Sequence, residues 1–522
     1  MLIKVTAHEI HPAPDQHRLA ASGLKKISTA TMVSSGVKSG LLMGFGAAAV
    51  VMGAVTVVYW PGLFLAQLQR MMTLSPTSMS FEIWRETPIP MYLECFMWNI
   101  TNVDEILAGQ RVPIKVAQMG PYVYREFHSK ENITWNDNST ITFYNQRYWQ
   151  FEPELSNGSL SDDVTSINPI IATIAHSVRF ERTVLKVGVD LFIRAFHRNL
   201  FLTANVSTWL FDGIDDPILD IASRFPEIEI PFDKFGWFYD RNGSLEYDGV
   251  FLMNTGAAEF SELGNIVKWR HSNRTLYRDE CGEVRGSTGE LWAPELGQPE
   301  VEIFASDICT YLTLGVDKDV RVDGIDGVQY AANMSVFDNG YNYPRMACYC
   351  DEVRDRNCLP PGALNVSLCR YGAPAFVSLP HFLHSDPYYP DKIEGMDPTE
   401  EHNFRLALEM FTGMPLSVAA QLQINLLVRH ISGVSINNQL PDEDVLVPMF
   451  WFRQEVRVTP EYARMARFAL NLRYGMPYGL YALTGIGVLL LMIGIWILIK
   501  KLLKSPETTP ILSSESASQE EQ

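Results

Sequence analysis

The run LLMGFGAAAVVMGAVTVVY, Leu41–Tyr59, carries no charge and is apolar along its whole length. Nineteen residues of α-helix, each rising about 1.5 Å, nearly cross the hydrocarbon core of a bilayer, which is about 30 Å thick. A second uncharged run, YGLYALTGIGVLLLMIGIWILI, covers Tyr478–Ile499. The sequence therefore predicts transmembrane helices over 40–62 and 476–499. The alternative for each run, a buried core helix, is disfavoured by the length of the run.

Both ends of the chain are expected on the cytosolic side of the membrane. Lysines precede the first apolar run, and a cluster of three lysines follows the second. Cytosolic flanks of spanning helices are enriched in Lys and Arg, which places both flanks inside. The predicted organisation is a cytosolic tail over 1–39, an ectodomain over 63–475 and a second cytosolic tail over 500–522.

Glycosylation sequons indicate on which side of the membrane the ectodomain lies. The pattern Asn-x-Ser/Thr is an acceptor for N-linked glycans in secreted segments. Nine such sequons lie between the two apolar runs, as expected for a luminal or extracellular segment. Their asparagines are Asn99, Asn132, Asn138, Asn157, Asn205, Asn242, Asn273, Asn333 and Asn365.

Six of the seven cysteines lie within residues 281–369, and Cys95 stands alone far upstream. An even set of cysteines in an oxidising compartment indicates a disulfide framework. Zinc is the competing interpretation, but the one close pair, Cys348-Tyr-Cys350, is a residue too tight for a zinc knuckle. Six cysteines allow 15 connectivities, and their spacing does not choose among them.

Composition and missing motifs argue against several classes of function. The chain has 42 basic and 60 acidic residues, a formal charge of −18, which argues against a general nucleic-acid-binding protein. It has no Gly-x-Ser-x-Gly elbow, no His-Glu-x-x-His and no phosphate-binding Gly-x4-Gly-Lys-Ser/Thr. We therefore expect no enzyme activity, no cofactor and no metal. His381 and His384 lie in a proline-rich segment and are expected to pack rather than to chelate.

Residues 168–200 differ from the rest of the ectodomain, most of which alternates in the manner of β-strands. Asn168-Pro169 is a typical helix start, with a capping side chain before a residue that needs no donor. Apolar residues then recur at helical spacing: Val184, Val187, Gly188, Leu191, Phe192, Ala195 and Phe196. On the other face lie five cations: Arg179, Arg182, Lys186, Arg194 and Arg198.

This basic stripe predicts attraction of anionic ligands, such as lipoprotein surfaces, anionic phospholipid or acidic patches on proteins. The alternative interpretation is an ordinary solvated helix face. His176 and His197 lie in the same segment and are candidates for sensing acidification near pH 6, with ordinary packing as the alternative.

Beyond these patterns, the chain resembles the class B scavenger receptors, a family that includes lysosomal integral membrane protein type 2. The likeness runs in order from the first span to the second, and no single motif carries it. The matching stretches are Gly120–Arg125 (GPYVYR), Leu210–Pro217 (LFDGIDDP), Asn254–Gly256 (NTG), Gly264–Trp269 (GNIVKW), Ser306–Cys309 (SDIC), Pro380–Leu383 (PHFL) and Gln423–Asn425 (QIN).

The resemblance implies a two-span membrane protein with an α+β ectodomain. Its core would be an antiparallel β-barrel with a helical apex at 168–200 and an internal hydrophobic tunnel. It also implies the disulfides Cys281–Cys348, Cys309–Cys369 and Cys350–Cys358, which leave Cys95 as a buried free thiol. The family's Leu-Trp-Gly-Tyr stretch here begins at Leu210 and reads LFDGI, and the N-terminal tail is long. Both departures argue against borrowing a ligand from one relative.

The C-terminal tail contains an acidic residue followed at a fixed distance by two aliphatic residues, Glu507, Ile511 and Leu512. This pattern is typical of the dileucine signals that clathrin adaptors bind. It predicts trafficking between the plasma membrane and the endosome or lysosome membrane, with stable residence at the surface as the alternative.

The function predicted from the sequence and the resemblance is that of a receptor. It would bind lipid, lipoprotein or other anionic ligands at the helical apex and mediate lipid uptake, lipid transfer and endocytosis. The alternative is an endocytic or lysosomal sorting receptor for a protein cargo. The sequence leaves open whether the chain forms a homo-oligomer.

Overall fold

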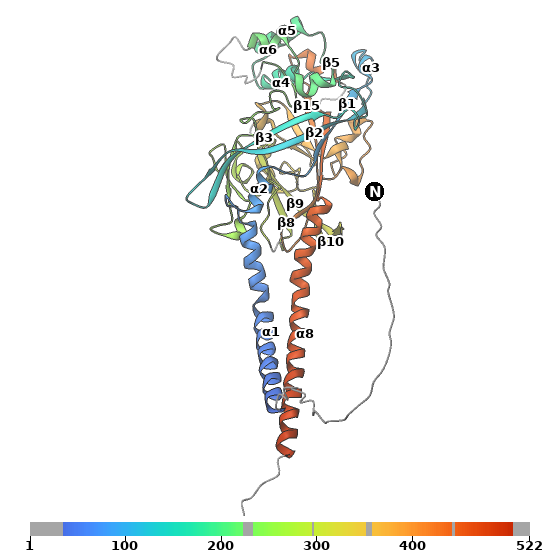
Figure 1. The fold of residues 1–522 in the computed structure, drawn as a ribbon. Helices are drawn as coiled ribbons and strands as arrows, with labels where there is room; N and C mark the ends of the chain where they lie inside the picture. The colour runs from blue at the N-terminus through green and yellow to red at the C-terminus, as the bar shows by residue number, and fades with distance from the viewer. Residues whose placement is uncertain (1–34, 223–232, 295–296, 351–357, 441–443, 505–522) are drawn as a thin grey trace, which may run out of the picture. The chain divides into compact units, whose positions relative to one another are not determined.

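The computed structural model describes residues 35–222, 233–294, 297–350, 358–440 and 444–504 (Figure 1). The chain divides into two compact units, one made of residues 1–60 with 475–522 and the other of residues 61–474. The division falls close to the predicted ends of the two spans. The predicted sorting motif of Glu507, Ile511 and Leu512 lies outside the described residues, as does most of the N-terminal tail.

Two helices, α1 (Ser35–Met72) and α8 (Pro460–Lys504), are long and apolar enough to cross a membrane. Both are longer than the predicted spans, because each continues helically beyond both ends of its apolar run. Each contains one internal proline, Pro61 in α1 and Pro477 in α8.

Small residues let the apolar parts of α1 and α8 pack closely. A Cβ added to Gly46 would lie 2.8 Å from the carbonyl oxygen of Gly487, and one added to Gly53 would overlap Thr484. The hydroxyl of Ser39 donates a hydrogen bond of 2.7 Å to the carbonyl oxygen of Gly494. The contact positions on α1 recur every seven residues, the period at which one face of a helix keeps facing its partner.

The unit of residues 61–474 is organised around a large, mainly antiparallel sheet that curves into a near-barrel (Figure 1). Its strands, in the order in which they neighbour one another, are β7 (Ile266–Trp269), β6 (Val250–Asn254), β3 (Thr140–Phe151), β2 (Ile114–Trp135), β1 (Met91–Ile100), β16 (Asp444–Arg457), β15 (Pro415–Arg429), β14 (Arg405–Leu408), β10 (Ile325–Ala331), β9 (Thr310–Val322) and β8 (Glu300–Ala305).

Shorter strands extend this sheet and form a second one. At the sides of the main sheet β11 (Ala363–Asn365) pairs with β12 (Ala375–Ser378), β12 pairs with β15, and β13 (Ile393–Glu394) pairs parallel to β2. A separate two-stranded sheet contains β4 (Asp163–Ile167) and β5 (Phe201–Asn205).

The sequence of β16 shows why the sheet has a covered interior. Residues 445–451, VLVPMFW, are buried at every position, so this half of the strand has no alternation of apolar and polar residues. A continuous apolar run is expected where both faces of a strand are covered. The two-sided packing confirms the predicted barrel core.

A short backbone bridge joins the two ends of the main sheet. Gly286 accepts a 2.9 Å hydrogen bond from the amide of Ile266 at the start of β7. Ser287 accepts one of 2.8 Å from Phe304 in β8 and donates one of 3.0 Å to Glu302. We call residues 285–287 the seam, because they close the sheet between β7 and β8.

Three disulfides fasten segments that precede and follow the seam in the chain. They are Cys281–Cys348, Cys309–Cys369 and Cys350–Cys358, the same pairs that the family resemblance implies. Cys95 in β1 is a buried free thiol, and burial, reinforced by the charge of Glu94, raises its pKa above the usual range.

Helices gather at one end of the barrel (Figure 1). They include α4 (Pro169–Ser177), α5 (Thr183–Phe196) and α6 (Pro217–Ala222), and α2 (Met79–Arg85) and α3 (Val103–Leu107) are shorter helices. Asn168 caps α4 as predicted, since its side-chain oxygen accepts a 2.9 Å bond from the amide of Ile170.

Gly286 is required at the seam for two reasons. Its φ is +88°, and an added Cβ would lie 2.6 Å from the carbonyl oxygen of Glu302. We expect Gly286→Val to lower the free energy of unfolding by about 1–3 kcal/mol, because a branched residue is strained at positive φ. Gly297→Val is the matched control, since nothing lies within 4 Å of its Cβ position. Denaturant unfolding of the two purified variants measures the difference, and equal stabilities would contradict the role given to the seam.

Candidate ligand-binding surface

The helix α5 turns its polar side toward the protein and its apolar side toward solvent. Asp190 and Ile193 are buried, with 8% and 0% of their surfaces exposed. At 100° per residue, Lys186 and His197 lie on this same inward side, and both are half-buried. Because Val189 and Ile193 also pack inward, the buried side is mixed, whereas an ordinary surface helix buries an apolar stripe.

The carboxylate of Asp190 fastens α5 to the short helix η9 (Ser435–Gln439), which follows β15. It accepts hydrogen bonds of 2.6 Å from the hydroxyl of Ser435 and 2.9 Å from the amide of Ile436. Arg194, one turn along α5, donates to it at 3.1 Å. Burial raises the pKa of Asp190, but these three donors outweigh burial and hold the pKa below its ordinary value. The carboxylate of Asp190 is therefore charged, and hydrogen bonds satisfy it where α5 packs against η9.

Close backbone approach completes this docking. Gly433, with φ of +91°, lies beneath α5, where an added Cβ would come within 3.2 Å of the Cβ of Lys186. Beyond the end of the helix, the amide of Leu200 donates a 2.8 Å bond to the side chain of Gln439. The helix is thus held along its polar side at both ends.

The outward side of α5 is a continuous apolar surface, which we call the outward face. The exposed fractions reach 86% at Val184 and 64% at Leu191. Phe192 and Phe196 form an edge-to-face pair with ring centroids 5.4 Å apart. An exposed apolar patch on one side of a helix is uncommon in monomeric proteins and marks a site of interaction. The exposed members of the outward face are Val184, Leu185, Val187, Leu191, Phe192 and Phe196, and Phe180 is exposed just before the helix.

The predicted cations do not form one exposed stripe. Lys186 is half-buried, and Arg194 bonds to both Asp190 and Ser435, because the polar side of α5 is the side that docks. Arg179 precedes the helix, donates to the carbonyl oxygen of His176 and stacks over Phe180. The five cations therefore do not share one fully exposed face, and their part in ligand binding stays a prediction.

Three of the five cations are exposed: Arg194, which is bonded to Asp190 and Ser435, and two that lie at the ends of α5. Arg182 is exposed at the N-terminal end of α5, and Arg198 is exposed just beyond its C-terminal end. The outward face therefore has a cation at each end.

The outward face itself was missed by the sequence interpretation. Its residues were recognised as one side of a helix, but no role was assigned to that side. Asp190, which interrupts the basic face, was the available signal, since a carboxylate among cations can anchor a helix by its polar side.

Of the two histidines of the apex, His176 follows the packing alternative rather than that of a pH sensor. His176 is buried in α4, and burial, followed by the charges of Arg179 and Arg429, lowers its pKa to about 3. It therefore stays neutral at pH 5–7, so it does not sense acidification near pH 6. His197 is half-buried, with its Nε2 3.0 Å from a carboxylate oxygen of Asp216.

His381 packs within the barrel, as predicted. Its Nε2 lies 2.9 Å from the side-chain oxygen of Gln118, its Nδ1 accepts a bond from the amide of Asp397, and its ring stacks on His402 at 4.2 Å. Within the described ranges, no cluster of three or more His, Cys, Asp or Glu side chains has the arrangement of a metal site.

All nine sequons lie in the unit of residues 61–474. Six of their asparagines are exposed to solvent: Asn132, Asn138, Asn157, Asn242, Asn273 and Asn333. Asn99, Asn205 and Asn365 are half-buried. Most of the predicted glycosylation sites are thus accessible on the folded ectodomain.

Comparison with known proteins identifies the family. The model of the CD36 family matches residues 44–498, which include the barrel and most of both apolar helices. The chain belongs to the CD36 family. Protein peste of Drosophila melanogaster is 33% identical over 411 residues, which is 77% of this chain and 72% of that protein.

Two further relatives in the CD36 family match over greater lengths. Scavenger receptor class B member 1 of Cricetulus griseus is 31% identical over 453 residues, or 85% of this chain and 86% of the relative. Lysosome membrane protein 2 of Homo sapiens is 29% identical over 442 residues, which is 83% of this chain and 88% of that protein. The resemblance to class B scavenger receptors is confirmed, and with it the predicted fold class of a two-span protein with a disulfide-bonded antiparallel near-barrel.

Burial of neutral His176 should make the free energy of unfolding decrease as the pH is lowered. In the unfolded chain the side chain of His176 takes up a proton below pH 6.5. In the native protein the same side chain stays neutral until about pH 3. The contribution of neutral His176 to the free energy of unfolding is therefore fully present above pH 6.5 and is lost as the pH is lowered. Between pH 7 and pH 5 we expect the free energy of unfolding of His176→Gln to fall by about 2 kcal/mol less than that of the wild type.

Denaturant unfolding at the two pH values measures this difference. His271→Gln, at an exposed histidine, is the control and should leave the pH dependence unchanged. An unaltered pH dependence in His176→Gln would contradict the buried neutral state.

Proposed function

We propose that this CD36-family protein is a receptor that docks lipid-bearing particles on the outward face of α5 and mediates lipid uptake and endocytosis. The single observation that supports this proposal is the solvent exposure of that face. In the free protein these side chains are exposed to water, whereas against a lipid or lipoprotein surface they would be removed from it.

The charges around the outward face favour an anionic surface. The chain as a whole carries a formal charge of −18, but Arg182 and Arg198 stand exposed at the two ends of α5. A cation beside an anionic membrane surface contributes about 1 kcal/mol of attraction, and salt screens it. We therefore assign orientation and long-range attraction to the cations and the larger share of the affinity to apolar contact.

The membrane arrangement in this proposal has both termini in the cytosol and the glycosylated ectodomain outside it. The positive flanks of both helices and the nine sequons support this orientation. The predicted signal of Glu507, Ile511 and Leu512 would then bring the receptor to clathrin adaptors, and hence from the plasma membrane to endosomes and lysosomes. An apolar tunnel through the barrel, implied by the family resemblance, would pass lipid onward.

The second candidate function is sorting of a protein cargo. The edge-to-face pair of Phe192 and Phe196 supports it, because exposed aromatic residues on a rigid helix are typical centres of protein–protein interfaces. The same surface serves both candidates, so the ligand has to be determined by binding.

Substitutions on the outward face separate the apolar from the electrostatic contribution. In full-length receptor, Leu191→Gln with Phe192→Gln should reduce binding of anionic vesicles and of lipoprotein at least about tenfold at every salt concentration, a loss of about 1.4 kcal/mol or more. Arg182→Gln with Arg198→Gln should weaken binding only at low salt.

The matched control is Leu276→Gln with Leu368→Gln, two exposed leucines outside α5, which should bind as the wild type does. Equal binding by the Leu191/Phe192 variant and this control would contradict lipid docking on α5. Binding of a labelled secreted-protein mixture, but of neither vesicles nor lipoprotein, would establish cargo sorting instead.

A further inference from the structure

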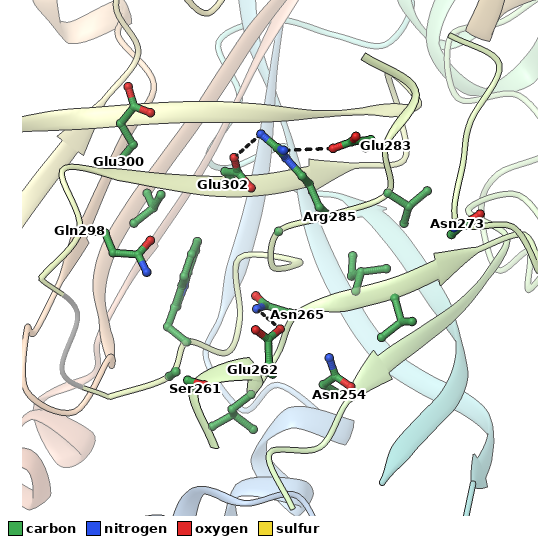
Figure 2. Close-up of a pocket in the computed structure, with 18 of the residues that line it drawn as sticks. Asn254, Ser261, Glu262, Asn265, Asn273, Glu283, Arg285, Gln298, Glu300 and Glu302 are labelled. Carbon is green, nitrogen blue, oxygen red and sulfur yellow. Dashed lines mark hydrogen bonds and ion pairs between the residues drawn. The ribbon is translucent and has the colours of Figure 1, made fainter. Parts of the chain in front are cut away.

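A pocket of about 940 Å³ lies beside the seam of the barrel, away from the elements that form the outward face (Figure 2). Residues of β7, of the segment 283–286 and of β8 form its walls. Backbone hydrogen bonds of the seam tie these three segments together, so the walls form one rigid unit. The volume is that of a site for a small organic ligand.

The lining combines many hydrogen-bonding groups with an apolar part of comparable extent. Asn254, Asn265 and Gln298 supply amides, each able to donate and accept. Trp292, which is 7% exposed, lies among the apolar lining residues. Its indole N–H has no hydrogen-bond partner in the part of the chain that the structure describes. An unpaired buried donor is costly, so this wall would gain from an acceptor.

The carboxylates of the pocket are largely engaged by groups of the pocket itself. Arg285 bonds to Glu283 at 3.0 Å and to Glu302 at 2.7 Å, and the amide of Asn265 donates to Glu262 at 2.8 Å (Figure 2). A cation would have to break these pairs. The chemistry therefore favours an uncharged ligand rich in hydroxyl and amide groups, which is the chemistry of an oligosaccharide.

One lining residue is itself a glycosylation acceptor. Asn273 is exposed, begins the sequon Asn273-Arg-Thr275, and is the one of the nine sequon asparagines that lines this pocket. Its carbonyl oxygen accepts a 3.1 Å bond from the amide of Val284, and the amide of Thr275 donates to Gly282 at 2.8 Å. The attachment point is thus fixed to a wall of the pocket.

We propose that the pocket holds the inner sugars of the N-linked glycan attached to Asn273. In Figure 2, Asn273 lies at one side of the pocket, with Gln298 and Glu300 at the other, so a chain begun at Asn273 can run across the lining. Covalent attachment gives the sugar a millimolar effective concentration, so weak contacts suffice to seat it. The seated glycan bridges the walls that the seam joins and stabilises this closure of the barrel.

The proposal requires the ectodomain to enter the secretory compartment, as in the proposed function, but it does not depend on what binds to α5. If vesicles fail to bind, the proposal about the glycan still stands. If the glycan experiment fails, the proposal of lipid docking on α5 still stands.

The rate at which a peptide:N-glycosidase releases each glycan from the native protein tests the seating. If the Asn273 glycan is seated about nine-tenths of the time, its release should be about tenfold slower than that of the exposed Asn333 glycan. Gln298→Trp, which fills the far side of the pocket, should abolish the difference. Gln110→Trp, at an exposed glutamine elsewhere, should preserve it.

An unoccupied Asn273, equal release rates in the wild type, or a difference that persists in Gln298→Trp would each overturn the proposal. Site-specific mass spectrometry of the released peptides provides both occupancy and rates for the full-length protein.

Hydrogen exchange tests the effect on the seam. Thr275→Ala, which removes the Asn273 sequon, should speed amide exchange in β7 and at 284–287 several-fold, while Ser335→Ala, which removes the Asn333 sequon, should not. Equal exchange in the two variants would contradict the stabilising role. Added free chitobiose should slow exchange in Thr275→Ala only at millimolar concentration, and an effect at micromolar concentration would assign the pocket to a free oligosaccharide instead.

Discussion

The carboxylate of Asp190 decides which side of α5 faces the solvent. Its bonds to Ser435 and Ile436 satisfy a charge that would be costly to bury alone, and they require the polar side of the helix to point inward. The apolar side then has no protein to cover it. Exposure of the outward face is therefore a consequence of one well-satisfied polar contact, and the candidate binding surface depends on that contact.

The partners of Asp190 are in turn positioned by the barrel. The helix η9 follows β15 after residues 430–434, and the long pairing of β15 with β16 lies in the middle of the sheet. That sheet is continuous through the seam, where Ser287 bonds to β8 and Gly286 to β7. A rigid scaffold at η9 presents α5 as a fixed surface rather than as a mobile helix, which reduces the entropy lost when a ligand binds.

Features that depend on residues close together in the chain were predicted from the sequence. The two apolar helices, the cap at Asn168 and the helical period of α5 follow from composition and spacing, and the disulfide pairs followed from the family resemblance. The direction of α5 could not be predicted, because Asp190 and Ser435 are 245 residues apart and either side of an amphipathic helix can face inward. Nor does any pattern mark Ser287 as the residue that closes the sheet, since backbone atoms make its bonds.

The most direct test of the account is the depth to which each position of α5 enters a lipid surface. Single cysteines along the helix can carry an environment-sensitive fluorophore, because the native Cys95 is buried and its raised pKa keeps it unreactive. On binding anionic vesicles, labels at Val184, Leu191 and Phe192 should shift to an apolar environment, and a label at Arg182 should stay near water. Labels that stay in water at all of these positions while vesicles bind would contradict docking by the outward face.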